Sequence, residues 1–114
     1  MFVELTKFKV KDGKSKQVDE WLNFLNEHME SVLLTLEDEQ MYVETIFREN
    51  DGDQEYLYWY SIQGSGGQYV GGSNHWVDQK HLEYWEECID QTSKPIDLTP
   101  SVTMIPTKIK NSMT

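Results

Sequence analysis

The sequence predicts an α+β domain in which a four-stranded antiparallel sheet carries two helices on one face. Segments with strand and helix patterns follow one another in the order strand, helix, strand, strand, helix, strand. An Asp-Gly pair separates the two middle strands, and a long amphipathic stripe follows the first strand. This order is the split βαβ or ferredoxin-like pattern, βαββαβ, which places the strands in the spatial order 4-1-3-2.

The first half of the chain predicts one strand and one long helix. Residues 2–10 are rich in β-forming side chains and are followed by an Asp-Gly turn. Residues 14–38 place apolar side chains at helical spacing, in a stripe roughly 120° wide. Ser15 is the expected N-cap of this helix. Because the pattern is long for one globular helix, a break near residues 30–31 is an alternative.

The second half predicts a hairpin, a helix and a last strand. The expected elements are strands at 40–49 and 55–63 joined by a turn at 50–53, a glycine-rich loop at 64–74, a helix at 75–91 and a strand at 101–109. Ser73 or Asn74 is the expected cap of the second helix. Pro106 places the last strand at an edge of the sheet, because proline cannot donate a hydrogen bond to a neighbouring strand.

Composition limits the class of protein. With 4 Trp, 6 Tyr and 4 Phe but only 7 Gly and 3 Pro in 114 residues, the chain is neither disordered nor of low complexity. We expect one domain at residues 1–110 and a disordered tail at 111–114. No apolar run is as long as a membrane span, and we see no signal peptide. Cys88 is the single cysteine, expected as a buried filler, so a cytoplasmic protein without disulfides is predicted.

The charge balance is strongly acidic. The chain carries 10 Lys and Arg against 20 Asp and Glu, a formal net charge of −10. This surplus repels phosphate groups, so nucleic acid and anionic membrane surfaces are disfavoured as partners. Neighbouring first and last strands would bring Lys7 and Lys9 close to Lys108 and Lys110 as a basic strip. A solvated acidic surface without a binding role is the alternative.

The third predicted strand carries large side chains on both faces. Tyr56, Tyr58 and Tyr60 point one way, whereas Leu57 and Trp59 point the other. Helices cover only one face of this kind of sheet, so the other face should be polar unless something else covers it. We therefore expect two copies to pack these faces together as a homodimer. A monomer with exposed tyrosines is the alternative.

The layout is similar to the dimeric α/β-barrel group of ferredoxin-like proteins. Within that group, the segments ELTKFKVKDGK, VDEWLNFL, MYVETIFRE, EYLYWYSIQG and HWVDQKHLEYWEECID resemble a small bacterial family of unknown function. The likeness covers roughly residues 3–107. It implies the fold and a pocket between sheet and helices, and it brings no established reaction. Better-known relatives of the fold include cofactor-free and haem-degrading monooxygenases and stress-response barrels.

The second predicted helix carries the most informative polar pair. Asp78 and His81 are three residues apart and fall on the face that holds the apolar residues of this helix. Asp78 would then orient His81 and raise its proton affinity, which leaves the imidazole as a general base or ligand contact. In the alternative, Asp78 caps backbone groups and His81 bonds a strand tyrosine or carbonyl.

Other chemistry has weaker support in the sequence. No metal site is expected, because His75 and His81 point in different directions from one helix; a pair of His28 and His81 across two helices is an alternative. The glycine-rich loop lacks the spacing of nucleotide-binding loops, so we expect a connecting loop or a lid. No cofactor is expected.

These observations favour the binding of a small aromatic or apolar molecule between helices and sheet. His81 would be the polar contact and Asp78 its partner. The other expected contacts are Tyr58, Trp59, Tyr60 and Glu44. Two alternatives stay open: a cofactor-free monooxygenase or isomerase that uses His81 as its base, and a structural or regulatory dimer whose interior is filled. A cavity beside His81 would separate the last of these from the others.

Overall fold

The computed structural model describes residues 1–67 and 72–113. Its elements in chain order are β1 (Phe2–Lys9), α1 (Ser15–Glu27), α2 (Met29–Asp38), β2 (Met41–Asn50), β3 (Glu55–Gln63), α3 (Trp76–Cys88), β4 (Ile96–Leu98) and α4 (Thr107–Lys110). Part of the expected glycine-rich loop, residues 68–71, lies outside the described residues. Within the described part of the chain, no helix is long and apolar enough to cross a membrane.

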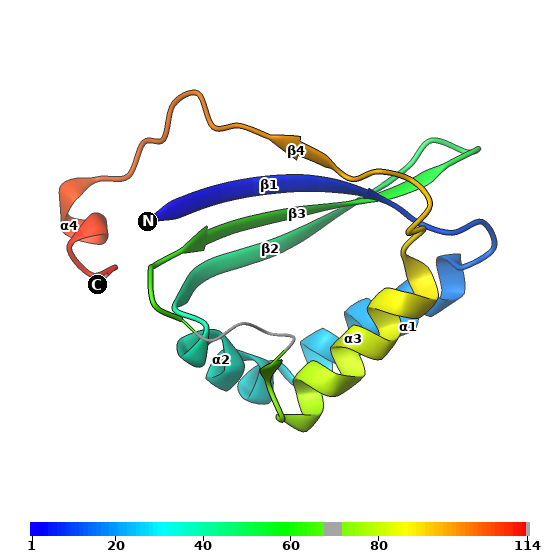
Figure 1. Ribbon diagram of the computed structural model, residues 1–114, viewed down its shortest axis with the longest axis horizontal. Coiled ribbons are helices and arrows are strands. Elements are labelled where there is room, and N and C mark those ends of the chain that lie inside the picture. Colours follow the sequence, from blue (N-terminus) through cyan, green and yellow to red (C-terminus); the bar gives the residue numbers. More distant parts are fainter. Residues whose placement is uncertain (68–71, 114) are drawn as a thin grey trace.

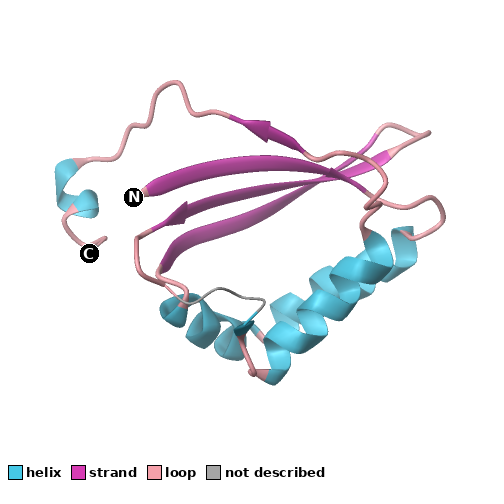
Figure 2. Ribbon diagram, in the orientation of Figure 1, coloured by secondary structure: helices cyan, strands magenta, loops and turns pink. Residues whose placement is uncertain are grey.

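The four strands form one antiparallel sheet in the order β2-β3-β1-β4, which confirms the predicted arrangement. Figure 1 shows the sheet as one layer and α1, α2 and α3 as a second layer on one of its faces. The layers lie close together where β1 leads into α1, and they separate toward the first turn of α3 (Figures 1 and 2). The fold is therefore ferredoxin-like, with two layers that diverge away from the connection between β1 and α1.

The hairpin between β2 and β3 forms as the Asp-Gly pair predicts. Asp51 Oδ1 accepts hydrogen bonds from the backbone N–H groups of Asp53 (3.0 Å) and Gln54 (2.8 Å). Asn50 Oδ1 accepts a third, from Gly52 (2.9 Å), whose φ of +97° favours glycine. These side-chain bonds replace strand pairing at the tip.

The last strand does not lie where the sequence pattern places it. β4 is Ile96–Leu98 rather than residues 101–109. Pro95 and Pro100 flank it, and because neither has a backbone N–H to donate, pairing with β1 stops after three residues. Pro106 is the N-cap of the short helix α4 and not a residue of an edge strand.

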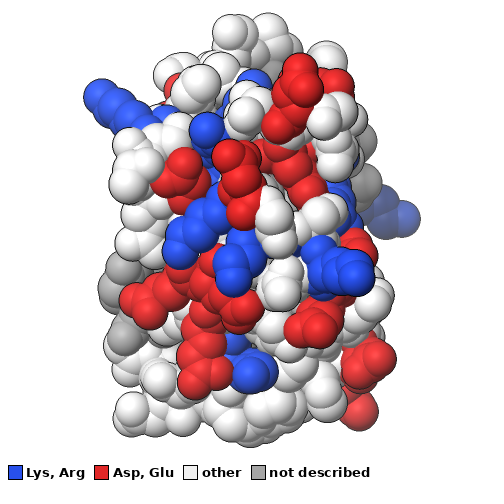
Figure 3. Space-filling model, turned by 90° about the vertical axis from the view of Figure 1, so that its right-hand side faces the viewer, with Lys and Arg blue, Asp and Glu red and all other residues white. Residues whose placement is uncertain are grey.

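The expected basic strip does not form, because the strand that would carry it is absent from that position. Lys108 and Lys110 lie in α4, beyond an extended segment that follows β4. Lys9 instead pairs with Asp90 at 3.9 Å. Figure 3 views the end where the layers meet and shows basic and acidic side chains interleaved over it.

The long helical pattern at 14–38 forms two helices that meet at His28, not near residues 30–31. His28 breaks the helix with φ −107° and ψ 30°. Ser15 is the first residue of α1 and not its cap. Lys14 holds the N-cap position, with no side-chain bond to the helix.

The cap of α3 also differs from the prediction. His75 is the N-cap, and its Nδ1 accepts a hydrogen bond from the backbone N–H of Val77 (3.2 Å). Ser73 Oγ accepts one from the backbone N–H of His75 (3.1 Å). The two acceptors thus share the capping role that the sequence assigned to residues 73–74. The Nδ1 atom of His75 is used in this cap.

The core lies where the two layers meet. The side chains fully buried there are Val18, Trp21, Leu57 and Cys88. The predicted helix at 75–91 ends at Cys88, because Ile89 is extended and bridges to Val10 beyond the end of β1. Burial raises the pKa of the Cys88 thiol to about 11, which fits the predicted role as an inert filler.

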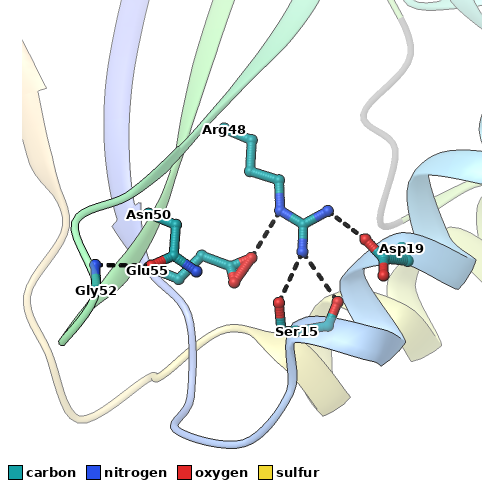
Figure 4. A network of polar contacts seen from close by, with 6 residues as sticks. All are labelled: Ser15, Asp19, Arg48, Asn50, Gly52 and Glu55. Atoms are coloured by element: carbon teal, nitrogen blue, oxygen red, sulfur yellow. Dashed lines mark hydrogen bonds and ion pairs between the residues drawn. The ribbon is translucent and has the colours of Figure 1, made fainter.

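Arg48 joins β2 to both β3 and α1 near the start of α1, where the two layers meet (Figure 4). Its Nε donates to Glu55 Oε1 at 2.7 Å, and Glu55 is only 8% exposed. Its Nη1 donates to Asp19 Oδ1, and its Nη2 donates to the carbonyl and the hydroxyl of Ser15 at 2.9 and 3.0 Å. The hydroxyl that was expected to cap α1 therefore accepts a bond from a strand.

The other face of the sheet carries large aromatic and apolar side chains, together with Lys7 over the rings of Tyr56 and Tyr58. The three tyrosines of β3 lie on this face, since the alternate residues of the same strand pack toward the helices. Phe47 on the edge strand β2 is 55% exposed, and Ile96 and Leu98 on the other edge strand, β4, are 53% and 48% exposed. The predicted aromatic surface is therefore present, and no described helix covers it (Figure 1).

Candidate functional site

A cavity of about 910 Å³ opens between the sheet and the helices. One wall is apolar and comes from α1 and α2, with Leu22, Leu25, Met29, Val32 and Leu36. Polar side chains line the cavity from β2, the first turns of α3 and the end of α2, and we call these groups the polar wall. A volume of this size accommodates a small organic ligand. The space between the layers is therefore not filled by side chains.

His81 on α3 lines this cavity, and its hydrogen bond with Trp21 determines which ring nitrogen carries the proton. Trp21 Nε1 donates to His81 Nδ1 at 2.9 Å. Nδ1 therefore carries no proton, and the neutral ring carries its proton on Nε2. Burial lowers the pKa of His81 to about 4, and the negative charge of Asp78 opposes only part of that shift. At neutral pH the group is an uncharged hydrogen-bond donor.

This geometry corrects the expected role of His81. The sequence suggested that Asp78 raises the proton affinity of the imidazole, but burial outweighs that charge. A neutral imidazole whose Nδ1 accepts from Trp21 has no second lone pair to act as a base. The expected partner of His81, a strand tyrosine or carbonyl, is replaced by a helix tryptophan.

Asp78 is buried in the first turn of α3, as the helical phase predicts. It is 5% exposed and lines the cavity. Among the residues that the structure describes, no hydrogen bond or ion pair reaches its carboxylate, so it does not cap the helix. A carboxylate buried in this way is costly unless something in the cavity pairs with it.

Two further carboxylates share the polar wall with Asp78. Glu39 follows α2 and is 9% exposed, and burial raises its pKa to about 7, assisted by the charges of Glu44 and Asp78. Glu44 on β2 accepts a hydrogen bond from Trp59 Nε1 at 2.9 Å. Burial raises the pKa of Glu44 as well, and Asp78 adds to this effect. Carboxylates from three elements thus line one cavity, and the charge of Asp78 acts on the other two.

No cation balances these groups within residues 1–67 and 72–113. The side chains that line the cavity include no Lys or Arg. The ion pairs of the described chain involve other acids, namely Asp19, Glu55, Glu83, Glu87 and Asp90. The same residues place no group of three His, Cys, Asp or Glu side chains suited to a metal ion.

The expected ligand contacts divide between the two faces of the sheet. Trp59 and Glu44 line the cavity together with the expected pair on α3. Tyr58 and Tyr60 lie on the opposite, open face, where Tyr58 donates to Glu49 at 2.7 Å. They therefore cannot be walls of the cavity, because side chains of a strand alternate between faces.

The remaining histidines lie outside the polar wall. The His28 ring lies 4.9 Å from Phe24 in a tilted arrangement and 5.0 Å from Trp76 edge to face, measured between ring centroids. His75 caps α3.

Glu39 is the residue of the polar wall that the sequence did not single out, since it follows a helix end and carries no periodic signal.

The fold and the cavity define a ferredoxin-like α+β protein with a binding-sized interior space. The chain belongs to a family of unknown function, DUF6176, whose model matches residues 1–111. A search of curated proteins found no match. Among solved structures, the crystal structure of an L-rhamnose mutarotase from Formosa agariphila is similar, with 13% identity and a TM-score of 0.58. The alignment covers 93% of this chain and 100% of the mutarotase, and at that identity it supports the fold alone.

Proposed function

We propose that this protein binds a small molecule with an aromatic or apolar body in the cavity between helices and sheet. The observation that carries the proposal is the cavity of about 910 Å³, lined by an apolar wall on α1 and α2 and by polar groups. Trp59 offers an aromatic surface, and the Nε2–H of His81 offers a directed hydrogen bond. This combination of an apolar body and a few convergent polar groups is typical of ligand sites.

Replacing His81 by alanine should remove one polar contact of the ligand. We expect that a library of small aromatic and apolar metabolites, with L-rhamnose included because of the solved neighbour, contains compounds that raise the melting temperature of the wild type. His81→Ala should lose most of that ligand-induced shift. Thermal-shift measurements on both proteins check this expectation.

The matched control is Lys80→Ala, on the same helix but facing solvent, where Lys80 pairs with Glu83 at 3.5 Å. This variant should keep the ligand-induced shift. If no compound stabilises the wild type, the proposed binding function is wrong. If His81→Ala and the wild type respond alike, His81 is not a ligand contact.

An enzymatic role would need a different base from the one that the sequence suggested. His81 donates from Nε2 and does not accept there. A carboxylate of the polar wall would have to take the proton instead. The oxygenase or isomerase alternative is therefore less well supported than binding.

The open face of the sheet supports a second proposal, that two copies pair through it as a homodimer. Phe47 lies on this face in the edge strand β2, opposite Tyr58 in the adjacent strand. We expect light scattering coupled to size exclusion to give twice the chain mass of 13.4 kDa for the wild type. Phe47→Glu should shift the protein to monomer, because it buries a charge in the interface.

Leu34→Glu on α2 is the control for this experiment. Leu34 is 56% exposed, close to the 55% of Phe47, but it lies on the helical layer. It should leave the mass unchanged. A wild type that is monomeric at micromolar concentration would contradict the dimer, and equal effects of both substitutions would contradict the assigned face.

A further inference from the structure

We propose that the cavity selects a ligand that carries a protonated amine on its aromatic or apolar body. This inference rests on the proposed small-molecule function and names the chemical class of the ligand. It is carried by three carboxylates that converge on one cavity from α3, β2 and the end of α2, with no cation beside them among the described residues.

The first step is the state of Asp78. Its residue is 5% exposed, and its carboxylate faces the cavity without a hydrogen-bond partner in the part of the chain that the structure describes. A carboxylate held in such a place without a partner is stabilised by a ligand that brings a positive charge. Asp78 is therefore the anchor expected for a positively charged group.

The second step concerns the other titratable groups that line the cavity with Asp78. Burial raises the pKa of both Glu39 and Glu44, and the charge of Asp78 adds to the shift at each; the charge of Glu44 also raises the pKa of Glu39. The other titratable groups that line the cavity are Glu4, Tyr42 and His81. None of these supplies a positive charge at neutral pH, since burial lowers the pKa of His81 to about 4. An anionic ligand would meet repulsion from every side of the polar wall.

The third step is the shape of the rest of the site. Trp59 lines the cavity and donates its indole N–H to Glu44. An ammonium group near a carboxylate and an aromatic face is attracted by both. The apolar side chains of α1 and α2 line the same cavity and suit the body of such an amine. A neutral hydroxyl could donate a hydrogen bond here, but it would not offset the charge.

Three probes with one body and different head groups test the inference: 2-phenylethylammonium, 2-phenylethanol and 3-phenylpropanoate. We expect the ammonium compound to bind at least tenfold more tightly than the alcohol, and the carboxylate compound not to bind. Isothermal titration at pH 7 in phosphate and in Tris should also show proton release with the ammonium compound alone. Release follows because a nearby cation lowers the pKa of Glu39 from about 7.

Asp78→Asn should weaken the ammonium compound tenfold or more and change the alcohol by less than threefold. Glu39→Gln provides a second variant should Asp78→Asn not fold, and it should abolish the proton release. Glu83→Gln is the control, since Glu83 lies on α3 with a side chain 70% exposed and should change neither affinity.

The outcomes separate the inference from the proposed function. If the alcohol binds as well as the ammonium compound, or if Asp78→Asn leaves the ammonium affinity unchanged, the amine class is wrong while small-molecule binding stands. If neither compound binds, the inference is overturned and the proposed binding of small aromatic molecules loses its support as well. Binding of the carboxylate compound would contradict the polar wall as described.

Discussion

Trp21→Ala should lower the free energy of unfolding by about 4 kcal/mol, the typical loss when a large buried aromatic side chain is deleted. Trp21 is fully buried and packs against Trp59 and Trp85, with ring centroids at 5.6 and 6.0 Å. The deletion leaves a cavity in the core and removes the donor that bonds His81 Nδ1. Urea unfolding followed by circular dichroism measures the change.

Trp21→Phe separates packing from the hydrogen bond. The phenyl ring keeps most of the packing but has no N–H, so we expect a smaller loss of about 1–3 kcal/mol. Nitrogen NMR of His81 should show a single Nε2–H tautomer in the wild type and a mixture in Trp21→Phe. A wild type with its proton on Nδ1, or a loss below about 1 kcal/mol for Trp21→Ala, would contradict the role assigned to this contact.

The parts of the fold that the sequence predicts are those with local signals. β3 runs from Glu55 to Gln63 as expected, because an Asp-Gly turn sets its start and alternating large side chains define its length. β4 was placed wrongly, because a strand of three residues between two prolines is too short to show a period. The break at His28 was displaced for a similar reason, since apolar residues continue at helical spacing on both sides of it.

The candidate site likewise divides into features that the sequence predicts and features that depend on tertiary packing. The burial of Asp78 follows from its phase on one helix, which a sequence reveals. The Trp21–His81 bond depends on how α1 and α3 are rotated against each other, and no single-helix pattern contains that rotation. Alternation separates Trp59 from Tyr58 and Tyr60, but only the packed structure decides which set meets the helices. Glu39 joins the site through tertiary proximity alone.

The other large effect concerns Arg48, whose loss should leave a buried acid without its partner. In Arg48→Met the guanidinium that bonds Glu55 at 2.7 Å is gone, and Glu55 is only 8% exposed. Removing one partner of a buried pair costs more than the pair contributes, because the remaining charge cannot reach water. The Arg48 side chain is 29% exposed, so we expect a loss of about 2–4 kcal/mol in the free energy of unfolding, measured by urea titration.

A second substitution and a surface control show whether the stranded charge is the cause. Arg48→Met combined with Glu55→Leu removes both charges and should recover part of the loss, so that the double-mutant cycle is strongly non-additive. Lys14→Met breaks the pair with Glu87, whose atoms lie 3.7 Å apart and whose side chains are 35% and 45% exposed. That change should cost less than about 1 kcal/mol, because water screens exposed pairs. Equal losses for Arg48→Met and Lys14→Met, or additive effects in the cycle, would contradict this explanation. The bonds of Arg48 in Figure 4 would then not stabilise the contact between sheet and helices near the start of α1.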